Sequence, residues 1–173
     1  MTIHVCSLSR VPDVALHLNP SRVVSLLDGD AAFPVLGLGE HHLQIGVHDI
    51  EAEMDGLDAC CDDRMQRIIK FVSSWNRQAP MLIHCWAGIS RSTATAYITA
   101  CIHNPNANEH VIAQALRAAS PTATPNRRFV ALADAALARG GRMNAAIEAI
   151  GRGSPRWPEI AEAEPFAIPS AFV

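Results

Sequence analysis

The segment MLIHCWAGISRST, residues 81–93, decides the fold and the chemistry that this sequence predicts. Its first four residues follow Pro80 and form a short apolar run that is typical of a buried strand. Small and polar residues around Gly88 then lead into the apolar pattern of residues 92–102, which predicts a tight loop that opens a helix. This order places Cys85 at the end of the strand and at the start of the loop.

The loop between Cys85 and Arg91 has the features of an anion-binding site. The first turn of a helix leaves backbone N–H groups without partners and carries partial positive charge. A loop curled at that point can surround an oxyanion with these groups. Arg91 lies six residues after Cys85, so its flat guanidinium fork can reach the same anion. The same positive field favours the thiolate, the nucleophilic form of a cysteine.

The rest of the chain alternates strand and helix patterns and then becomes helical. The expected strands span residues 3–8, 22–27, 42–47 and 81–84. The expected helices span residues 11–18, 58–75 (with Asp58 as N-cap), 92–102, 108–119, 127–139 and 143–150. This order predicts an α/β fold with a central, mostly parallel β-sheet flanked by helices and a helical C-terminal half. We expect a catalytic domain over residues 1–141 and an extension over 142–173 that is packed on the domain or partly mobile.

The composition excludes several classes of protein. A chain of 173 residues with 49% hydrophobic and 18% charged residues predicts one soluble domain with a real core. The formal net charge of -3 argues against a nucleic-acid partner, and no apolar stretch is long enough to predict a membrane span. Because five cysteines fit no compact disulfide framework and no signal peptide is recognised, we expect the reducing cytoplasm.

The stretch HCWAGISRS, residues 84–92, resembles the signature loop of the cysteine-based protein tyrosine phosphatases, and most closely that of the dual-specificity branch. Three further stretches are similar to the same family. They are IGVHD at residues 45–49, where that branch has its general acid, IIKFVSSW at 68–75, and Pro125-Asn126 with Phe129 before the last core helix. The resemblance covers about residues 22–138 and implies a phosphatase-like fold and hydrolysis of phosphomonoesters without a metal or cofactor.

The resemblance also implies a role for each residue of the site. Cys85 is the nucleophile, and Arg91 holds the phosphoryl oxygens. Ser92 offers its hydroxyl to the departing sulfur, and Asp49 is the general acid and then the general base. The phosphate-binding groups are the backbone N–H groups of Trp86, Ala87, Gly88, Ile89, Ser90 and Arg91. His84 and Asn126 support the loop.

The identity of the general acid leaves alternatives open. Asp55 and Asp58 lie in the same stretch as Asp49, and Asp55 stands at a distance from the following helix that also suits the acid. Asp49 is preferred because it directly follows an apolar strand, and a strand end positions a side chain better than the middle of a loop. The histidines near Cys60 and Cys61 lack the usual spacing of metal ligands, so no metal site is predicted.

Three functions fit the sequence. The first is a phosphatase acting on a phosphorylated protein, phosphotyrosine above all, or on a small phosphomonoester. Trp86 and Ile89 stand where phosphoinositide phosphatases carry two lysines, which disfavours an inositol-lipid substrate. The second is a phosphopeptide-binding module without turnover. The third is a thiol-based arsenate reductase, which would need a second, resolving cysteine near Cys85.

Overall fold

The computed structural model describes residues 1–154 and 161–172, and within them the chain forms one sheet of five strands. The strands are β1 (Thr2–Ser7), β2 (Arg22–Leu27), β3 (His42–Gly46), β4 (Met81–Cys85) and β5 (Phe166–Pro169). Their order in space is β3-β2-β4-β1-β5, and all neighbours are parallel except β5, which is antiparallel to β1. The predicted mostly parallel sheet is confirmed.

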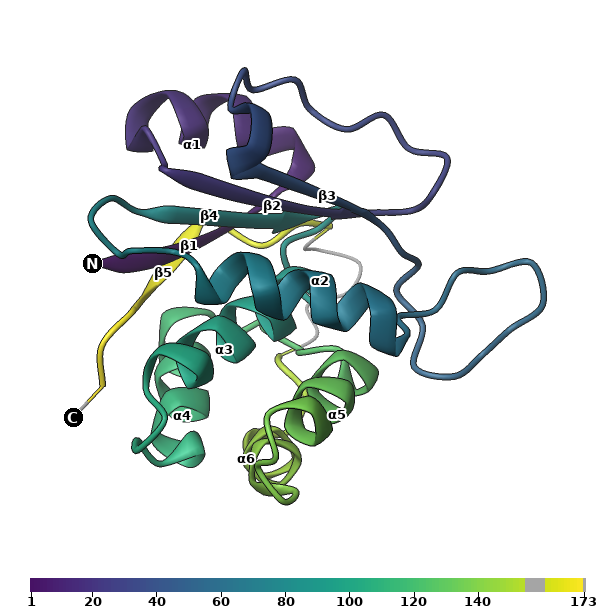
Figure 1. Cartoon of the computed structure of the whole chain (residues 1–173), viewed down its shortest axis with the longest axis vertical. Coiled ribbons are helices and arrows are strands. Elements are labelled where there is room, and N and C mark those ends of the chain that lie inside the picture. Colours follow the sequence, from purple (N-terminus) through teal and green to yellow (C-terminus); the bar gives the residue numbers. More distant parts are fainter. Residues whose placement is uncertain (155–160, 173) are drawn as a thin grey trace.

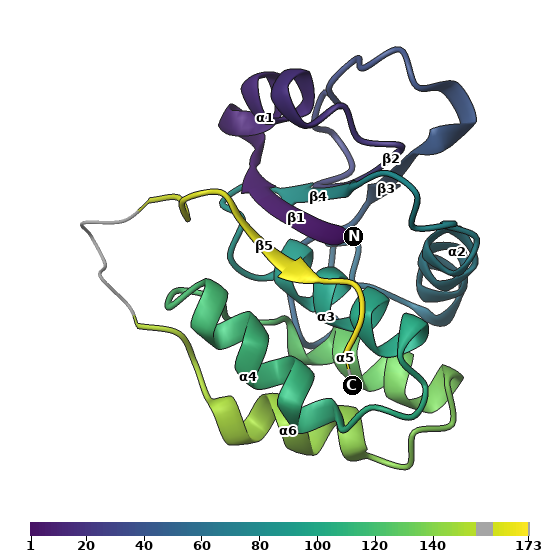
Figure 2. The same cartoon turned by 90° about the vertical axis from the view of Figure 1, so that its left-hand side faces the viewer.

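Helices cover both faces of the sheet (Figures 1 and 2). One face carries α1 (Val11–Leu18). The other carries α2 (Asp62–Ser73), α3 (Arg91–His103), α4 (Glu109–Ala119), α5 (Arg127–Ala136) and α6 (Arg142–Ile150). The predicted α/β fold with a helical C-terminal half is therefore confirmed. Across residues 1–154 and 161–172, no helix combines the length and the apolar character that crossing a membrane requires.

Strand β4 and helix α3 lie at the centre of the fold because nearly all of their residues are buried. All five residues of β4 are buried, because this strand lies between β1 and β2 and is covered by helices on both faces. A fully covered parallel strand is mostly apolar instead of alternating, as MLIHC is apart from His84. Helix α3 follows β4 and is buried along its first eleven residues, Arg91 to Cys101, against the sheet and the neighbouring helices.

The carboxyl ends of the four parallel strands meet at one edge of the sheet. The register places Ser7 of β1 beside Cys85 of β4, and Leu27 of β2 beside Gly46 of β3. The residues that directly follow these strands, Asp28 and Val47 among them, therefore gather near Cys85. This edge is where open α/β sheets bind their ligands.

Two predicted helix boundaries were wrong by three residues or more. Helix α2 begins at Asp62 with Cys61 as its N-cap, so Asp58 is not the cap. Asp58 instead pairs with His48, since its backbone N–H donates to His48 Nδ1 (2.9 Å) and its carbonyl accepts from the His48 N–H (2.8 Å). Helix α5 ends at Ala136 and not at Arg139, because Ala138 adopts a left-handed conformation (φ 51°) that stops the helix.

Strand β5 was not predicted, and it brings part of the C-terminal extension into the sheet. Ile168 pairs with Ile3 across the antiparallel ladder and is fully buried. The division of the chain at residue 141 stays a prediction. The parts of the extension at residues 155–160 and 173 lie outside the residues that the structure describes.

Replacing Ile168 with alanine tests whether β5 belongs to the cooperative fold. Removing a fully buried isoleucine side chain should lower the free energy of unfolding by about 2–5 kcal/mol, which urea denaturation measures. Leu16→Ala is the control, because Leu16 is 80% exposed on α1 and its loss should change stability little. Equal and small effects of both substitutions would show that β5 unfolds independently.

Candidate active site

Cys85 closes strand β4 and lies at the base of the loop that leads into α3. We call residues 85–91 the signature loop. The Cys85 side chain is nearly inaccessible, with 2% of the residue exposed, and its Sγ lies 3.1 Å from the Oγ of Ser92. Ser92 is the second residue of α3 and is fully buried. The structure therefore brings this hydroxyl into hydrogen-bonding contact with the sulfur.

Gly88 lets the signature loop approach the backbone of strand β1. Its φ of 72° lies in the left-handed region. A Cβ at this position would lie 2.9 Å from the carbonyl carbon of Cys6 and 3.0 Å from the nitrogen of Ser7. Because the obstructing atoms are backbone atoms and cannot turn aside, only glycine fits here without displacing β1.

The signature loop turns several of its carbonyl groups outward and bonds them to surrounding segments. The backbone N–H groups of three such segments donate to the loop, Leu8 to Trp86 (3.1 Å), Ala163 to Ala87 (2.8 Å) and Thr124 to Ile89 (2.9 Å). Among hydrogen bonds between described residues, none uses a backbone N–H of residues 86–90 as donor. The loop is thus fixed from outside and keeps its own donors available for an anion.

Arg91 is buried and anchored through one end of its guanidinium group. Its Nη1 donates to Oδ1 of Asp28 (2.9 Å) and to the carbonyl oxygen of Val47 (2.7 Å). Its Nε is buried and has no acceptor within the part of the chain that the structure describes. Oδ2 of Asp49 lies 3.9 Å from this Nε, which is too far for a hydrogen bond. A buried donor without a partner is costly, so Nε is suited to an oxyanion that enters the site.

Asp49 lies against the signature loop. Its Oδ1 accepts from the hydroxyl of Ser90 (2.7 Å) and from Nδ2 of Asn126 (2.8 Å). Asn126 is itself fixed, because its Oδ1 accepts from the backbone N–H of Phe129 and caps helix α5. The second oxygen of Asp49 is the one that faces Arg91.

The two rival aspartates occupy other surroundings. Asp58 forms an ion pair with Arg64 (3.0 Å) at the start of α2. Asp55 is exposed in the loop between β3 and α2, and no residue of the described chain forms a hydrogen bond or ion pair with its carboxylate. Asp49 is therefore the member of this group that the structure brings to the signature loop.

His84 lies behind Cys85 in a buried chain of polar groups. Its Nδ1 is 3.5 Å from the carbonyl oxygen of Cys85, and its Nε2 is in contact with the hydroxyl of Ser25. The same hydroxyl lies 2.7 Å from Nε2 of His42. Burial lowers the pKa of His84 to about 4 and also lowers the pKa of His42. His84 is therefore neutral at pH 7 and serves as a hydrogen-bonding group.

Asp28 is a site residue that the sequence analysis did not identify. Its Oδ1 accepts from Arg91, and its Oδ2 accepts from Nε1 of Trp86 (2.9 Å). A usable signal was present, because Asp28 directly follows a buried strand, as Asp49 nearly does.

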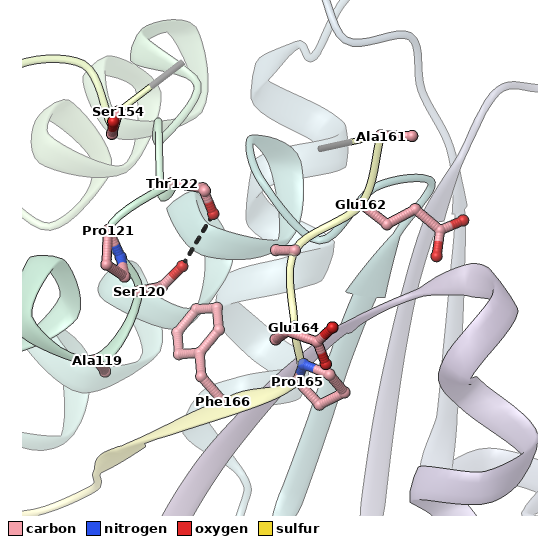
Figure 3. A pocket seen from close by; sticks show the side chains of 11 residues that line it. Ala119, Ser120, Pro121, Thr122, Ser154, Ala161, Glu162, Glu164, Pro165 and Phe166 are labelled. Atoms are coloured by element: carbon pink, nitrogen blue, oxygen red, sulfur yellow. Dashed lines mark hydrogen bonds between the residues drawn. The ribbon is translucent and has the colours of Figure 1, made fainter. Parts of the chain in front are cut away.

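A separate cavity of about 460 Å³ lies beside the C-terminal segment (Figure 3). Residues 119–122 and 161–166, with Ser154, line it, and none of the predicted site residues does. The carboxylate of Glu162 accepts hydrogen bonds from Ser7 (2.8 Å) and Ser9 and so ties this segment to the end of β1. Among the described residues, no three His, Cys, Asp or Glu side chains gather as a metal site would require.

The five cysteines are free and differ in environment, which gives a chemical test of the site. Burial raises the pKa of the Cys6, Cys60 and Cys101 thiols to about 12, so these should not react with iodoacetate at pH 7. Carboxymethylation should label Cys85, at the helix N-terminus, and the partly exposed Cys61.

Inorganic phosphate should protect Cys85 from this reaction, because it would occupy the signature loop, while Cys61 should stay reactive as the internal control. Peptide mapping by mass spectrometry measures both effects. Equal protection of the two cysteines, or none, would contradict an anion site around Cys85.

Comparison with known proteins agrees with this geometry. Residues 58–122 match the family model described as protein-tyrosine phosphatase, a range that includes β4, the signature loop and α3. The PTP-2 phosphatase of Cydia pomonella has a similar structure, with a TM-score of 0.57 and 20% identity over 77% of this chain and 84% of that one. DUSP15 has a TM-score of 0.59 and 18% identity over 85% of this chain and 90% of its own. These two likenesses concern the fold, and no curated protein matches by sequence. The resemblance stated from the sequence is confirmed over residues 58–122, where the family model matches, and the fold of the chain is similar to that of these two phosphatases.

Proposed function

We propose that the protein hydrolyses phosphomonoesters through a covalent phosphocysteine formed on Cys85. One observation carries the proposal. At the N-terminus of α3, the sulfur of Cys85 lies in a loop whose backbone N–H groups, and the buried Nε of Arg91 beside it, have no acceptor among residues 1–154 and 161–172. This combination suits a tetrahedral oxyanion placed directly over a nucleophile.

The first step transfers the phosphoryl group to sulfur. The signature loop and Arg91 bind the phosphoryl oxygens, and the thiolate of Cys85 attacks phosphorus. The S–P bond forms while the ester P–O bond breaks, and the leaving oxygen takes a proton from Asp49. The hydrogen bonds from Ser90 and Asn126 hold one oxygen of Asp49 and leave the other for this proton.

The second step releases phosphate. Asp49, now a carboxylate, removes a proton from a water molecule that attacks phosphorus. The S–P bond breaks and the electron pair returns to sulfur, where the Ser92 hydroxyl at 3.1 Å stabilises the thiolate by a hydrogen bond. The two steps together consume one water molecule and regenerate the protonated acid.

The substrate that we propose is a phosphorylated protein, phosphotyrosine first, with small phosphomonoesters as alternatives. Trp86 supports an aromatic substrate, since it belongs to the signature loop and is 42% exposed beside the site. We place the reaction in the reducing cytoplasm, where a cysteine nucleophile stays a thiol. A site that binds phosphopeptides without turnover is the alternative that the following experiments separate from a hydrolase.

Replacing Cys85 with serine should abolish hydrolysis and keep anion binding. Turnover of p-nitrophenyl phosphate should fall by about 10³-fold or more, because the hydroxyl is a far weaker nucleophile than the thiolate. Tungstate affinity, measured by calorimetry, should persist because the loop N–H groups and Arg91 remain. Cys61→Ser is the matched control and should behave as wild type.

Retention of turnover by Cys85→Ser would exclude the phosphocysteine route. If the wild-type protein instead binds phosphotyrosine peptides but hydrolyses no phosphomonoester, the protein is a binding module.

Replacing Asp49 with asparagine tests the general acid. The amide oxygen can still accept from Ser90 and Asn126, so the loop should keep its structure. We expect kcat to fall by about 10²–10⁴-fold for alkyl phosphates and much less for aryl phosphates whose leaving groups need no proton.

Asp55→Asn is the control for this prediction, because its carboxylate lies in the exposed loop. The decisive measurement is kcat against the pKa of the leaving group for both variants. A leaving-group dependence that changes in Asp55→Asn and not in Asp49→Asn would assign the acid to Asp55.

A further inference from the structure

We propose that Asp28 is a positioning residue that sets the guanidinium of Arg91 for oxyanion capture and holds the indole of Trp86 beside it. The inference rests on the proposed function, which it deepens by assigning a residue outside the signature loop to phosphate binding. Asp28 directly follows β2, and its two carboxylate oxygens contact two different residues of the signature loop.

The first contact fixes the orientation of Arg91. Both hydrogens of Nη1 are engaged, one by Asp28 Oδ1 at 2.9 Å and the other by the Val47 carbonyl at 2.7 Å. Two acceptors on one nitrogen define the plane of the rigid guanidinium group. The opposite edge, formed by Nε and Nη2, is the one that receives two parallel hydrogen bonds from an oxyanion.

The state of Nε supports this orientation. Nε is buried and donates a hydrogen bond to no residue in the described part of the chain. Asp49 stands 3.9 Å from it and so does not occupy it. The protein thus uses Nη1 for anchoring and keeps Nε for another acceptor, which is the division of donors that bidentate phosphate binding requires.

The second contact distinguishes positioning from simple charge neutralisation. A carboxylate that only compensated the buried cation would need no bond to Trp86. Here the indole Nε1–H donates to Oδ2 at 2.9 Å, so the carboxylate is held by two residues of the signature loop, Trp86 and Arg91. Since the carboxylate is fixed from both sides, it can transmit a defined orientation to Arg91.

Asp28→Asn is the direct test, with tungstate as the probe. Positioning predicts that tungstate affinity falls by about 10-fold to 100-fold, the usual effect of losing a hydrogen bond between charged groups. The KM for p-nitrophenyl phosphate should rise together with this loss. Asp30→Asn is the matched control, because Asp30 is exposed two residues later in the same loop.

Unchanged or tighter tungstate binding in Asp28→Asn would overturn the proposal, because a carboxylate that merely adds negative charge near the site weakens anion binding. Trp86→Phe is the second variant if Asp28→Asn does not fold. It keeps the ion pair with Arg91 but frees one carboxylate oxygen, so affinity should fall by a smaller factor, about 2-fold to 5-fold. Wild-type affinity in Trp86→Phe would count against the proposal in the same way.

Tungstate binding separates this inference from the proposed hydrolysis, since it requires no turnover. If the wild-type protein binds tungstate but hydrolyses no phosphomonoester, the hydrolase proposal fails and the role of Asp28 is still decided by affinity. If hydrolysis proceeds and Asp28→Asn binds tungstate as the wild type does, only the role of Asp28 is rejected.

Discussion

The buried positive charge of Arg91 is the constraint around which the carboxyl edge of the sheet is organised. A guanidinium group removed from water is costly unless carboxylates and carbonyl oxygens surround it. Three adjacent strands supply what this charge requires, since Asp28 follows β2, Val47 follows β3, and Arg91 itself follows β4 through the signature loop. The strand order β3-β2-β4 therefore also determines which groups surround Arg91. It brings two acceptors from separate loops to the cation and places that cation beside the sulfur of Cys85.

The same edge is rigid because the neighbouring segments hold the signature loop from outside. Gly88 lies directly on the backbone of β1, and the N–H groups of Ala163 and Thr124 bond to carbonyls of the loop. These contacts come from the C-terminal segment and from the turn before α5, which are far apart in sequence. The cost of ordering the loop is met during folding, so its inward N–H groups need no rearrangement when an anion binds. Preorganised dipoles of this kind are the main source of electrostatic stabilisation in active sites.

The elements with strong local patterns could be predicted from the sequence, and those that depend on distant partners could not. The apolar runs at 22–27 and 81–84 and the helix at 11–18 were placed almost to the residue. The start of α2 was misplaced because Asp58 has the chemistry of an N-cap but pairs with His48. Strand β5 was missed because FAIP is too short to be told from a loop without β1 beside it. Asp28 directly follows a buried strand, which was a usable signal, but its role depends on Trp86 and Arg91, which lie about sixty residues away in sequence.

The central claim is that phosphate passes through the sulfur of Cys85, and trapping that intermediate tests it most directly. Ser92→Ala removes the hydroxyl 3.1 Å from the sulfur, so the second step should slow and the phosphoenzyme should accumulate. Turnover of p-nitrophenyl phosphate by this variant can be stopped by a rapid denaturing quench and followed by peptide mapping with mass spectrometry. The account predicts a phosphoryl group on the peptide that contains Cys85, at the Cys85 sulfur. A phosphoryl group on a histidine, or continued turnover with no phosphoenzyme at any time point, would contradict it.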